Sequence, residues 1–217
     1  MMTSLFSSFD PSSNLLQLNW LTFFLPMIIM PMNFWMKKSR WLMIKKKITK
    51  KIFFEFNNST KHKEIMYLSI SIMIMILINN FMSLFPYIFT PTSHISISMS
   101  LSIPTWMMLM IYGWTKFSNS MFKHLLPVGT PGPIMPMMIL IETTGNLIRP
   151  ISLSVRLTAN MIAGHLIMIL LGNLNSIKMI YMILPIQMML MMFESAISII
   201  QAYVFATLMT LYSSEIP

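Results

Sequence analysis

The sequence contains no cysteine among its 217 residues, and it is poor in charge. The lack of cysteine excludes a disulfide framework, a thiolate metal site and a cysteine nucleophile. Charged residues make up only 10% of the chain, whereas a typical soluble domain carries about 25%. Hydrophobic residues make up 55%, and the mean hydropathy is +0.68. This composition is typical of an integral membrane protein.

Short catalytic motifs are missing as well. The sequence has no G-x-x-x-x-G-K-[ST] phosphate loop, no H-E-x-x-H, no G-x-S-x-G and no C-x-x-C-H haem attachment site. Nucleotide hydrolysis, metalloprotease, serine hydrolase and c-type haem functions therefore lack support, and we expect no cofactor and no metal site. The N-terminal stretch MMTSLFSSFDPSSN lacks Lys and Arg, so we expect neither a signal peptide nor an imported transit peptide there.

Acidic residues are few, six against fifteen basic ones, which gives a net charge of +9. Ten of the basic residues fall between Lys37 and Lys63, directly after an apolar stretch. This is the position of a positive-inside anchor, so we expect the charge to face an anionic membrane surface and not nucleic acid. We interpret the 28 methionines as replacements for Leu and Ile on lipid-facing surfaces and not as a copper-binding set.

Long apolar stretches predict an all-α integral membrane protein that forms a single membrane domain over residues 1–217. The expected segments are a first span at 19–36, an interfacial amphipathic helix at 40–56, upright spans at 65–85 and 95–115, and two longer stretches at 136–172 and 177–212. At about 1.5 Å per residue, each longer stretch would extend roughly 55 Å against a hydrocarbon thickness of about 30 Å. We therefore expect a strongly tilted antiparallel hairpin, or helices bent at Pro150 and Pro185.

The connections between these segments predict the orientation of the chain. Segments 37–63 and 116–123 hold twelve Lys or Arg residues, whereas segments 1–18, 86–94 and 172–178 hold one, Lys178. Because Lys and Arg accumulate on the inner side of membranes, we expect five crossings with the N-terminus outside and the C-terminus inside.

Arg156 is the most costly residue of the hairpin, because a charged side chain near the middle of a span costs about 2.5–3.5 kcal/mol or more. At about 100° per residue, one helix face carries Glu142, Gly145, Arg149, Ser152, Arg156, Asn160 and Ala163. The small residues on this face would let another helix come close. His165 points to the opposite face of the same helix.

The last stretch carries a second polar stripe of Glu194, Ser198 and Gln201. In an antiparallel hairpin folded near residues 178–180, Arg156 comes level with Gln201, and His165 comes level with Glu194. Each polar group inside the membrane then has a partner at its own depth, as burial in a low dielectric demands.

The charged members of these stripes also have structural interpretations. Arg156 lies far from both ends of its stretch, which disfavours a snorkelling side chain. Arg149 is nearer the inner side and can reach carbonyls or phosphates. Glu142, which the same register sets opposite Glu215, sits in the first turns of its helix, where the dipole favours a carboxylate.

The uncharged and titratable members leave similar alternatives. His165, with an ordinary pKa near 6.5, suits a proton relay together with Glu194, or it is simply hydrogen-bonded to that carboxylate. Asn160 and Gln201 can serve as hydrogen-bonding contacts between helices. No role is assigned to His62, His94 or His124, which lack metal-ligand spacing.

The stretches ETTGNLIRPISLSVRLTANMIAGHL and ESAISIIQAYVFATLMTLYSSE resemble subunit a of the F-type ATP synthases in its animal mitochondrial form. The resemblance continues upstream in NNFMSLFPYIFTPTSH, IYGW and PVGTPGP and covers nearly the whole chain. It implies a non-catalytic, proton-translocating stator subunit. Synthesis inside the mitochondrion would fit the missing transit peptide, and a code that reads AUA as Met would explain the methionine content.

The resemblance further implies roles for single residues. Arg156 matches the family's essential arginine, which faces the rotating ring of c subunits and separates two offset proton half-channels. Four residues match family positions that line the half-channel from the intermembrane space: Asn160, His165, Glu194 and Gln201. Glu142 matches the carboxylate of the matrix-side route, and Ser152 matches a position with a small or hydroxyl side chain. Bacterial relatives carry the acid and the imidazole of His165 and Glu194 in exchanged places, and Pro185 falls where proline is unusual.

The implied partners are the c-ring, peripheral-stalk and other membrane-sector subunits, protons and the lipid bilayer. The implied location is the mitochondrial inner membrane, with the N-terminus toward the intermembrane space and the C-terminus toward the matrix. The residues alone leave two other classes open. A secondary proton or ion transporter would usually show two matching halves, and a purely structural respiratory-complex subunit would need no ionisable stripe.

Overall fold

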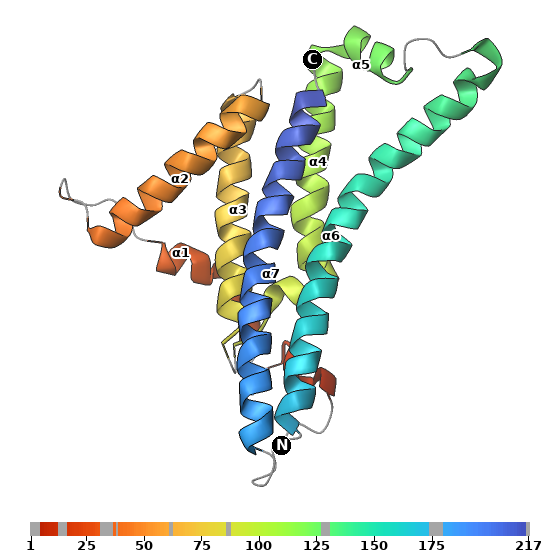
Figure 1. Ribbon diagram of the computed structural model, residues 1–217. Helices are drawn as coiled ribbons and strands as arrows, with labels where there is room; N and C mark the ends of the chain where they lie inside the picture. Colours follow the sequence, from red (N-terminus) through yellow and green to blue (C-terminus); the bar gives the residue numbers. More distant parts are fainter. Residues whose placement is uncertain are drawn as a thin grey trace.

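The computed structural model describes residues 5–12, 17–30, 37, 39–60, 63–85, 88–126, 131–173 and 180–215. All regular structure in this part of the chain is helical (Figure 1). In chain order, with η for 3-10 helices, it comprises η1 (Leu5–Phe9), η2 (Leu18–Phe24), α1 (Leu25–Ile29), α2 (Arg40–Ser59), α3 (Lys63–Ser83), η3 (Pro91–Ser93), α4 (Ile95–Lys116), α5 (Ser118–His124), η4 (Gly132–Ile134), α6 (Met135–Asn173) and α7 (Ile180–Glu215).

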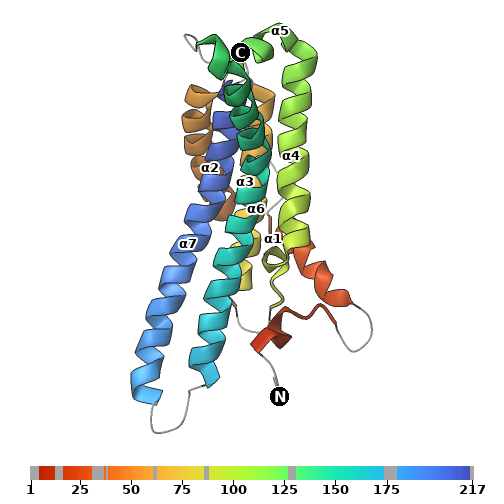
Figure 2. The same ribbon diagram turned by 90° about the vertical axis from the view of Figure 1, so that its right-hand side faces the viewer.

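Four helices, α3, α4, α6 and α7, are long and apolar enough to cross a membrane. α3 has 21 residues and α4 has 22, which at about 1.5 Å per residue matches a hydrocarbon layer of about 30 Å. Both stand upright in the two views of Figures 1 and 2. The predicted class, an all-α integral membrane protein, is confirmed.

Two helix pairs hold the bundle together, α3 with α7 and α4 with α6. α3 is the most deeply buried of the four long helices, and its Met66 and Ile76 are almost completely enclosed. On α7 the core includes Ala202 and Ala206, both fully buried. Small side chains let membrane helices approach closely, and these alanines lie in the core that α7 shares with α3.

α6 and α7 form the expected C-terminal hairpin, with 39 and 36 residues. At about 1.5 Å per residue they extend about 58 and 54 Å, much longer than a hydrocarbon layer of about 30 Å. Pro150 and Pro185 both lie inside these helices. Figure 1 shows that α6 leans away from α7 toward its N-terminal end. Both helices therefore continue through their prolines without a break, and such long helices fit a hydrocarbon layer only when they are strongly tilted or bent.

The region expected as a first span, 19–36, has a shorter helix than the hydropathy suggested. The apolar helical stretch runs from Leu18 to Ile29 and is too short to count as a crossing helix, and residues 31–36 lie outside the described residues. Four helices of the described residues are thus able to cross a membrane, and the fifth crossing expected at 19–36 stays a prediction. Proline explains the early stop, because Met30, which precedes Pro31, has extended backbone (φ −67°, ψ 116°).

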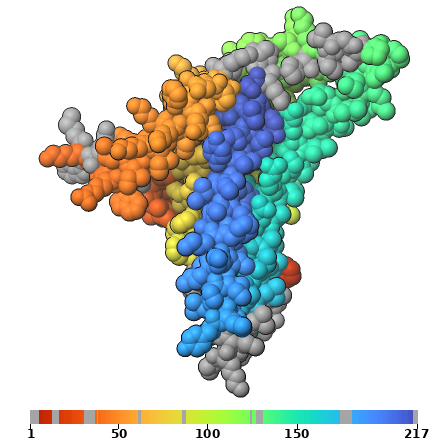
Figure 3. Space-filling view, in the orientation of Figure 1, coloured from red at the N-terminus to blue at the C-terminus, as the bar shows by residue number. Residues whose placement is uncertain are grey.

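α2 combines exposed basic residues with exposed apolar ones. At its start, Ser39 Oγ accepts a hydrogen bond from the Leu42 backbone N–H at 3.4 Å. Near its end, Phe56 is only 2% exposed and stacks on Tyr203 of α7, with ring centres 6.3 Å apart. The exposed apolar side chains are Trp41, Met43, Ile44, Ile48 and Phe54. α2 projects from the side of the bundle in Figure 3, and this amphipathic surface is the kind that lies at a membrane interface.

Candidate functional site

The two polar stripes of α6 and α7 meet in one direct hydrogen bond. Gln201 is buried, and its Nε2 donates to the backbone carbonyl oxygen of Arg156 at 2.8 Å. The contact confirms the register predicted for the hairpin, in which Arg156 and Gln201 lie at the same level. Since the carbonyl accepts this bond, Gln201 ties α6 to α7 without engaging the guanidinium.

The Arg156 side chain lies on an exposed stripe of α6 that also contains Ser152 and Asn160. The Ser152 hydroxyl donates within the helix to the Arg149 carbonyl oxygen at 2.9 Å. Within the described ranges, no carboxylate forms an ion pair with Arg156. A cation on a membrane-spanning helix costs about 2.5–3.5 kcal/mol without compensation, and an anion or water beside the guanidinium would offset that cost.

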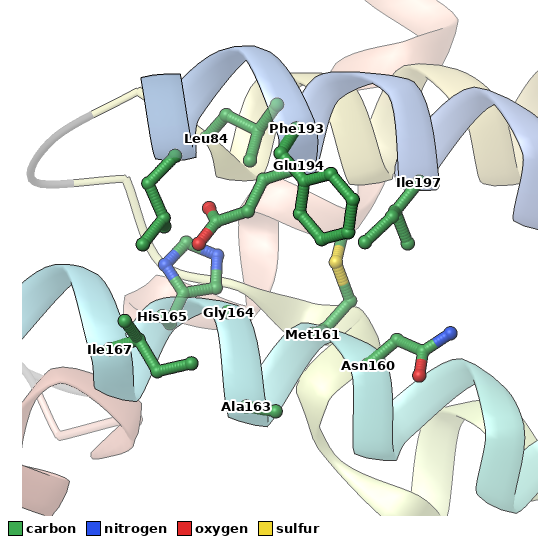
Figure 4. Close-up of a pocket in the computed structure, with 11 residues that line it drawn as sticks. Leu84, Asn160, Met161, Ala163, Gly164, His165, Ile167, Phe193, Glu194 and Ile197 are labelled. Carbon is green, nitrogen blue, oxygen red and sulfur yellow. The ribbon is translucent and has the colours of Figure 1, made fainter. Parts of the chain in front are cut away.

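A cavity of about 240 Å³ lies between α6 and α7 (Figure 4). Its polar lining consists of Asn160 and His165 from α6 and Glu194 from α7, and most of the remaining lining is apolar. Figure 4 shows the Glu194 carboxylate directed toward the His165 ring. The structure therefore brings these two residues into one cavity, as the hairpin register predicted. A space of this size holds several water molecules, each of which occupies about 30 Å³ in the liquid.

His165 and Glu194 share the cavity without the direct hydrogen bond that the sequence left as an alternative. His165 Nε2 and Glu194 Oε1 are both buried, and neither atom has a hydrogen-bond partner among the described protein groups. Burying a polar group without a partner costs roughly 2–7 kcal/mol. Water in the cavity can supply the missing bonds, and an imidazole and a carboxylate bridged by water can pass protons.

Gly164 lets α6 and the Glu194 side chain come unusually close. A Cβ added at Gly164 would lie 2.9 Å from Glu194 Oε1 and 3.0 Å from its Cδ. Gly145 and Gly172 on the same helix have nothing within 4 Å of the corresponding position. Sequence reasoning missed this role, because the spacing of glycines along α6 does not distinguish Gly164 from the other two.

The remaining predicted residues lie outside the cavity. The Arg149 guanidinium carbon is 4.8 Å from the centre of the Tyr212 ring, a distance typical of a cation–π contact. Glu142 lies two turns further toward the N-terminal end of α6, in the part that leans away from α7 in Figure 1. The side chain of Glu215 lies outside the described residues, so the expected opposition of Glu142 and Glu215 stays a prediction.

His94, to which the sequence assigned no role, makes a contact that links distant parts of the chain. Its Nε2 donates to the backbone carbonyl oxygen of Phe9 at 3.0 Å. The Phe9 ring in turn meets the His165 ring edge to face, with centres 6.3 Å apart. No sequence pattern signals this contact, because the partners are far apart in the chain. In the part of the chain that is described, no group of three or more His, Asp or Glu side chains is placed to hold a metal ion.

Known proteins are similar to this chain over its whole length. The sequence model of the family described as ATP synthase A chain matches residues 16–214. ATP synthase subunit a of Locusta migratoria is 49% identical over 227 aligned residues, with 100% of both chains covered. The subunits of the same name from Drosophila mauritiana and Aedes aegypti are 48% and 47% identical, again with 100% of both chains covered. The chain belongs to the ATP synthase A chain family.

The resemblance stated for the α6 and α7 sequences is thereby confirmed, and the insect relatives show that the chain has the animal form of this ATP synthase subunit a family. The range 16–214 contains every residue that lines the cavity, together with the exposed stripe of Ser152, Arg156 and Asn160. η1 (Leu5–Phe9) precedes that range but lies inside the full-length alignments with the insect proteins.

Proposed function

We propose that the chain is the proton-translocating stator subunit of the membrane sector of a mitochondrial ATP synthase, without phosphate chemistry of its own. Membership of the ATP synthase A chain family and four helices able to cross a membrane support this role. The observation that carries the finer proposal is the exposed Arg156, whose backbone is tied to Gln201 while its side chain has no acidic partner among the described residues.

The partner of Arg156 is a carboxylate on a neighbouring subunit, namely the c-ring. The exposed stripe leaves room for such a helix, because Gly145 has nothing within 4 Å of the position of a Cβ. A passing carboxylate is stabilised in its charged form beside the guanidinium. Arginine suits this position because it does not lose its proton in proteins, so it blocks direct proton transfer past itself.

Two half-channels meet at Arg156 from opposite sides of the membrane. His165 lies nine residues beyond Arg156 on α6 and Glu142 lies fourteen residues before it, which at 1.5 Å per residue is about 14 and 21 Å along the helix. The cavity with Asn160, His165 and Glu194 belongs to the half-channel from the intermembrane space, and Glu142 belongs to the matrix side. Each proton that crosses supplies about 2.3 kcal/mol per 100 mV.

We place the chain in the mitochondrial inner membrane, with its N-terminus toward the intermembrane space and its C-terminus toward the matrix. The Lys-rich helix α2 then lies at the matrix surface, as the positive-inside rule favours. Besides the c-ring, its partners are the peripheral stalk and other membrane-sector subunits. Arg149 and Ser152 support the exposed stripe from within α6, since the Ser152 hydroxyl is bonded to the Arg149 carbonyl.

The test is proton pumping by the assembled ATP synthase reconstituted into liposomes. Arg156→Ala is expected to abolish ATP-driven acidification while ATP hydrolysis by the soluble sector continues. The matched control is Val155→Ala, since Val155 is a neighbouring exposed side chain without charge, and it should pump normally. Coupled pumping by Arg156→Ala would refute the proposed role of this residue.

A further inference from the structure

His94 sits at the start of α4 in an aromatic cluster. Its ring lies 5.1 Å from the ring of Trp20 and 5.3 Å from that of Phe89, measured between centres, and Trp20 meets Phe89 edge to face at 5.6 Å. Its Nε2 contacts the Phe9 carbonyl oxygen at 3.0 Å. Because a carbonyl only accepts, His94 must carry a proton on Nε2. The cluster therefore holds the end of η1 by an oriented hydrogen bond.

The segment held in this way packs on the cavity residue His165. η1 contacts α6, and the Phe9 ring meets the His165 ring edge to face at 6.3 Å. His165 Nε2 has no hydrogen-bond partner among the described protein groups. The orientation of the imidazole toward the cavity thus depends on ring packing rather than on a hydrogen bond at that atom.

We propose that His94 is a positioning residue of the proton path: through the backbone of Phe9 it holds the Phe9 ring against His165 and so fixes the imidazole in the cavity beside Glu194. This inference rests on the proposed function, since it gives His94 a role only if protons pass through His165. Phe9, Trp20, Phe89 and His94 belong to segments that hydropathy and polar spacing did not connect with the hairpin.

Two substitutions separate the hydrogen bond from the ring packing. His94→Phe keeps an aromatic ring between Trp20 and Phe89 but removes the N–H donor, whereas His94→Gln keeps an N–H donor without the ring. Passive proton flux through the membrane sector of the assembled complex is the measured quantity. His94→Phe is expected to lower the flux about fivefold, the net effect of one hydrogen bond, and His94→Gln is expected to retain most of it.

A double-mutant cycle with His165→Gln distinguishes positioning from a general loss of stability. If His94 acts through His165, His94→Phe has no further effect on flux once His165 is replaced. An equal fivefold loss in both backgrounds would overturn the inference and leave His94 as a structural contact. If His165→Gln alone conducts normally, the assignment of His165 to the proton path fails, which is a different outcome.

A second measurement does not depend on flux. The chain has no cysteine, so Leu190→Cys places a single thiol of this subunit in the cavity that Leu190 lines. Loss of the His94 contact frees the His165 ring and is expected to change the rate of thiol modification by a water-soluble methanethiosulfonate about fivefold. His94→Gln should restore the original rate. Identical rates in His94→Phe and the unsubstituted chain would overturn the inference.

Discussion

Replacement of Gly164 by alanine tests whether the close contact between α6 and Glu194 matters for proton transfer. The new Cβ would lie 2.9 Å from Glu194 Oε1, 3.0 Å from Cδ and 3.3 Å from Cγ. Ordinary contact begins near 3.4 Å, so the carboxylate must retreat by several tenths of an ångström. The atoms in the way belong to the end of a flexible side chain, so a changed rotamer relieves the overlap at a cost of about 0.5–1.5 kcal/mol.

The folding effect and the functional effect of Gly164→Ala are expected to differ. Alanine favours a helix over glycine by about 0.8–1.0 kcal/mol, which roughly cancels the rotamer cost. The protein should therefore remain as stable as before, while the carboxylate moves within the cavity that it shares with His165. We expect normal assembly, normal ATP hydrolysis and a clear loss of passive proton flux.

Gly172→Ala is the matched control for this experiment. It lies on the same helix and has nothing within 4 Å of the new Cβ, so it gains helix propensity without displacing a side chain. Thermal unfolding in detergent and proton flux in liposomes are measured for both variants. Equal proton flux in Gly164→Ala and Gly172→Ala would refute the reasoning, because displacement of Glu194 would then have no consequence.

Two further predictions concern the packing of α7. Gln201→Leu removes the hydrogen bond to the Arg156 carbonyl and should destabilise the protein by about 0.6 kcal/mol, the mean for hydrogen bonds between membrane helices. Thermal unfolding of this variant is compared with that of the exposed control Ile200→Leu. Equal unfolding temperatures for the two variants would contradict the prediction. Phe56 is only 2% exposed, so Phe56→Ala leaves a cavity and should lower the free energy of unfolding by about 3–5 kcal/mol. Phe54 is 69% exposed, so Phe54→Ala should change that free energy by no more than about 0.5 kcal/mol. Equal unfolding temperatures for the two variants would argue against α2 being anchored through Phe56.

The periodicity of the sequence was sufficient to predict those contacts that follow directly from helix geometry. The long apolar stretches predicted the four crossing helices, and polar residues at matching distances from the hairpin turn predicted that Arg156 and Gln201 are level. The same reasoning predicted that His165 and Glu194 share a depth, and the structure places both in one cavity. These properties depend only on hydrophobic burial and on regular rise per residue.

Hydropathy did not predict where a helix ends, because that depends on the backbone conformation of single residues. Residues 19–36 are apolar enough for a span, yet the described helix ends at Ile29 because the residue before Pro31 disfavours helical backbone. Composition over a window does not weigh a single proline in this way. Whether His165 and Glu194 form a direct hydrogen bond likewise depends on their side-chain rotamers. The register of two helices predicts that the two residues lie at the same level, but it does not predict their rotamers.

The sequence by itself determined the membrane class, the long C-terminal hairpin, its register and the family, because hydrophobic length, helical period and motif identity are local or additive properties. Only the tertiary structure decided that Gly164 makes room for Glu194, that Arg149 lies against the Tyr212 ring, and that Phe9 contacts both His94 and His165. Those contacts join segments with no shared period, and they depend on how tilted helices and loops pack in three dimensions.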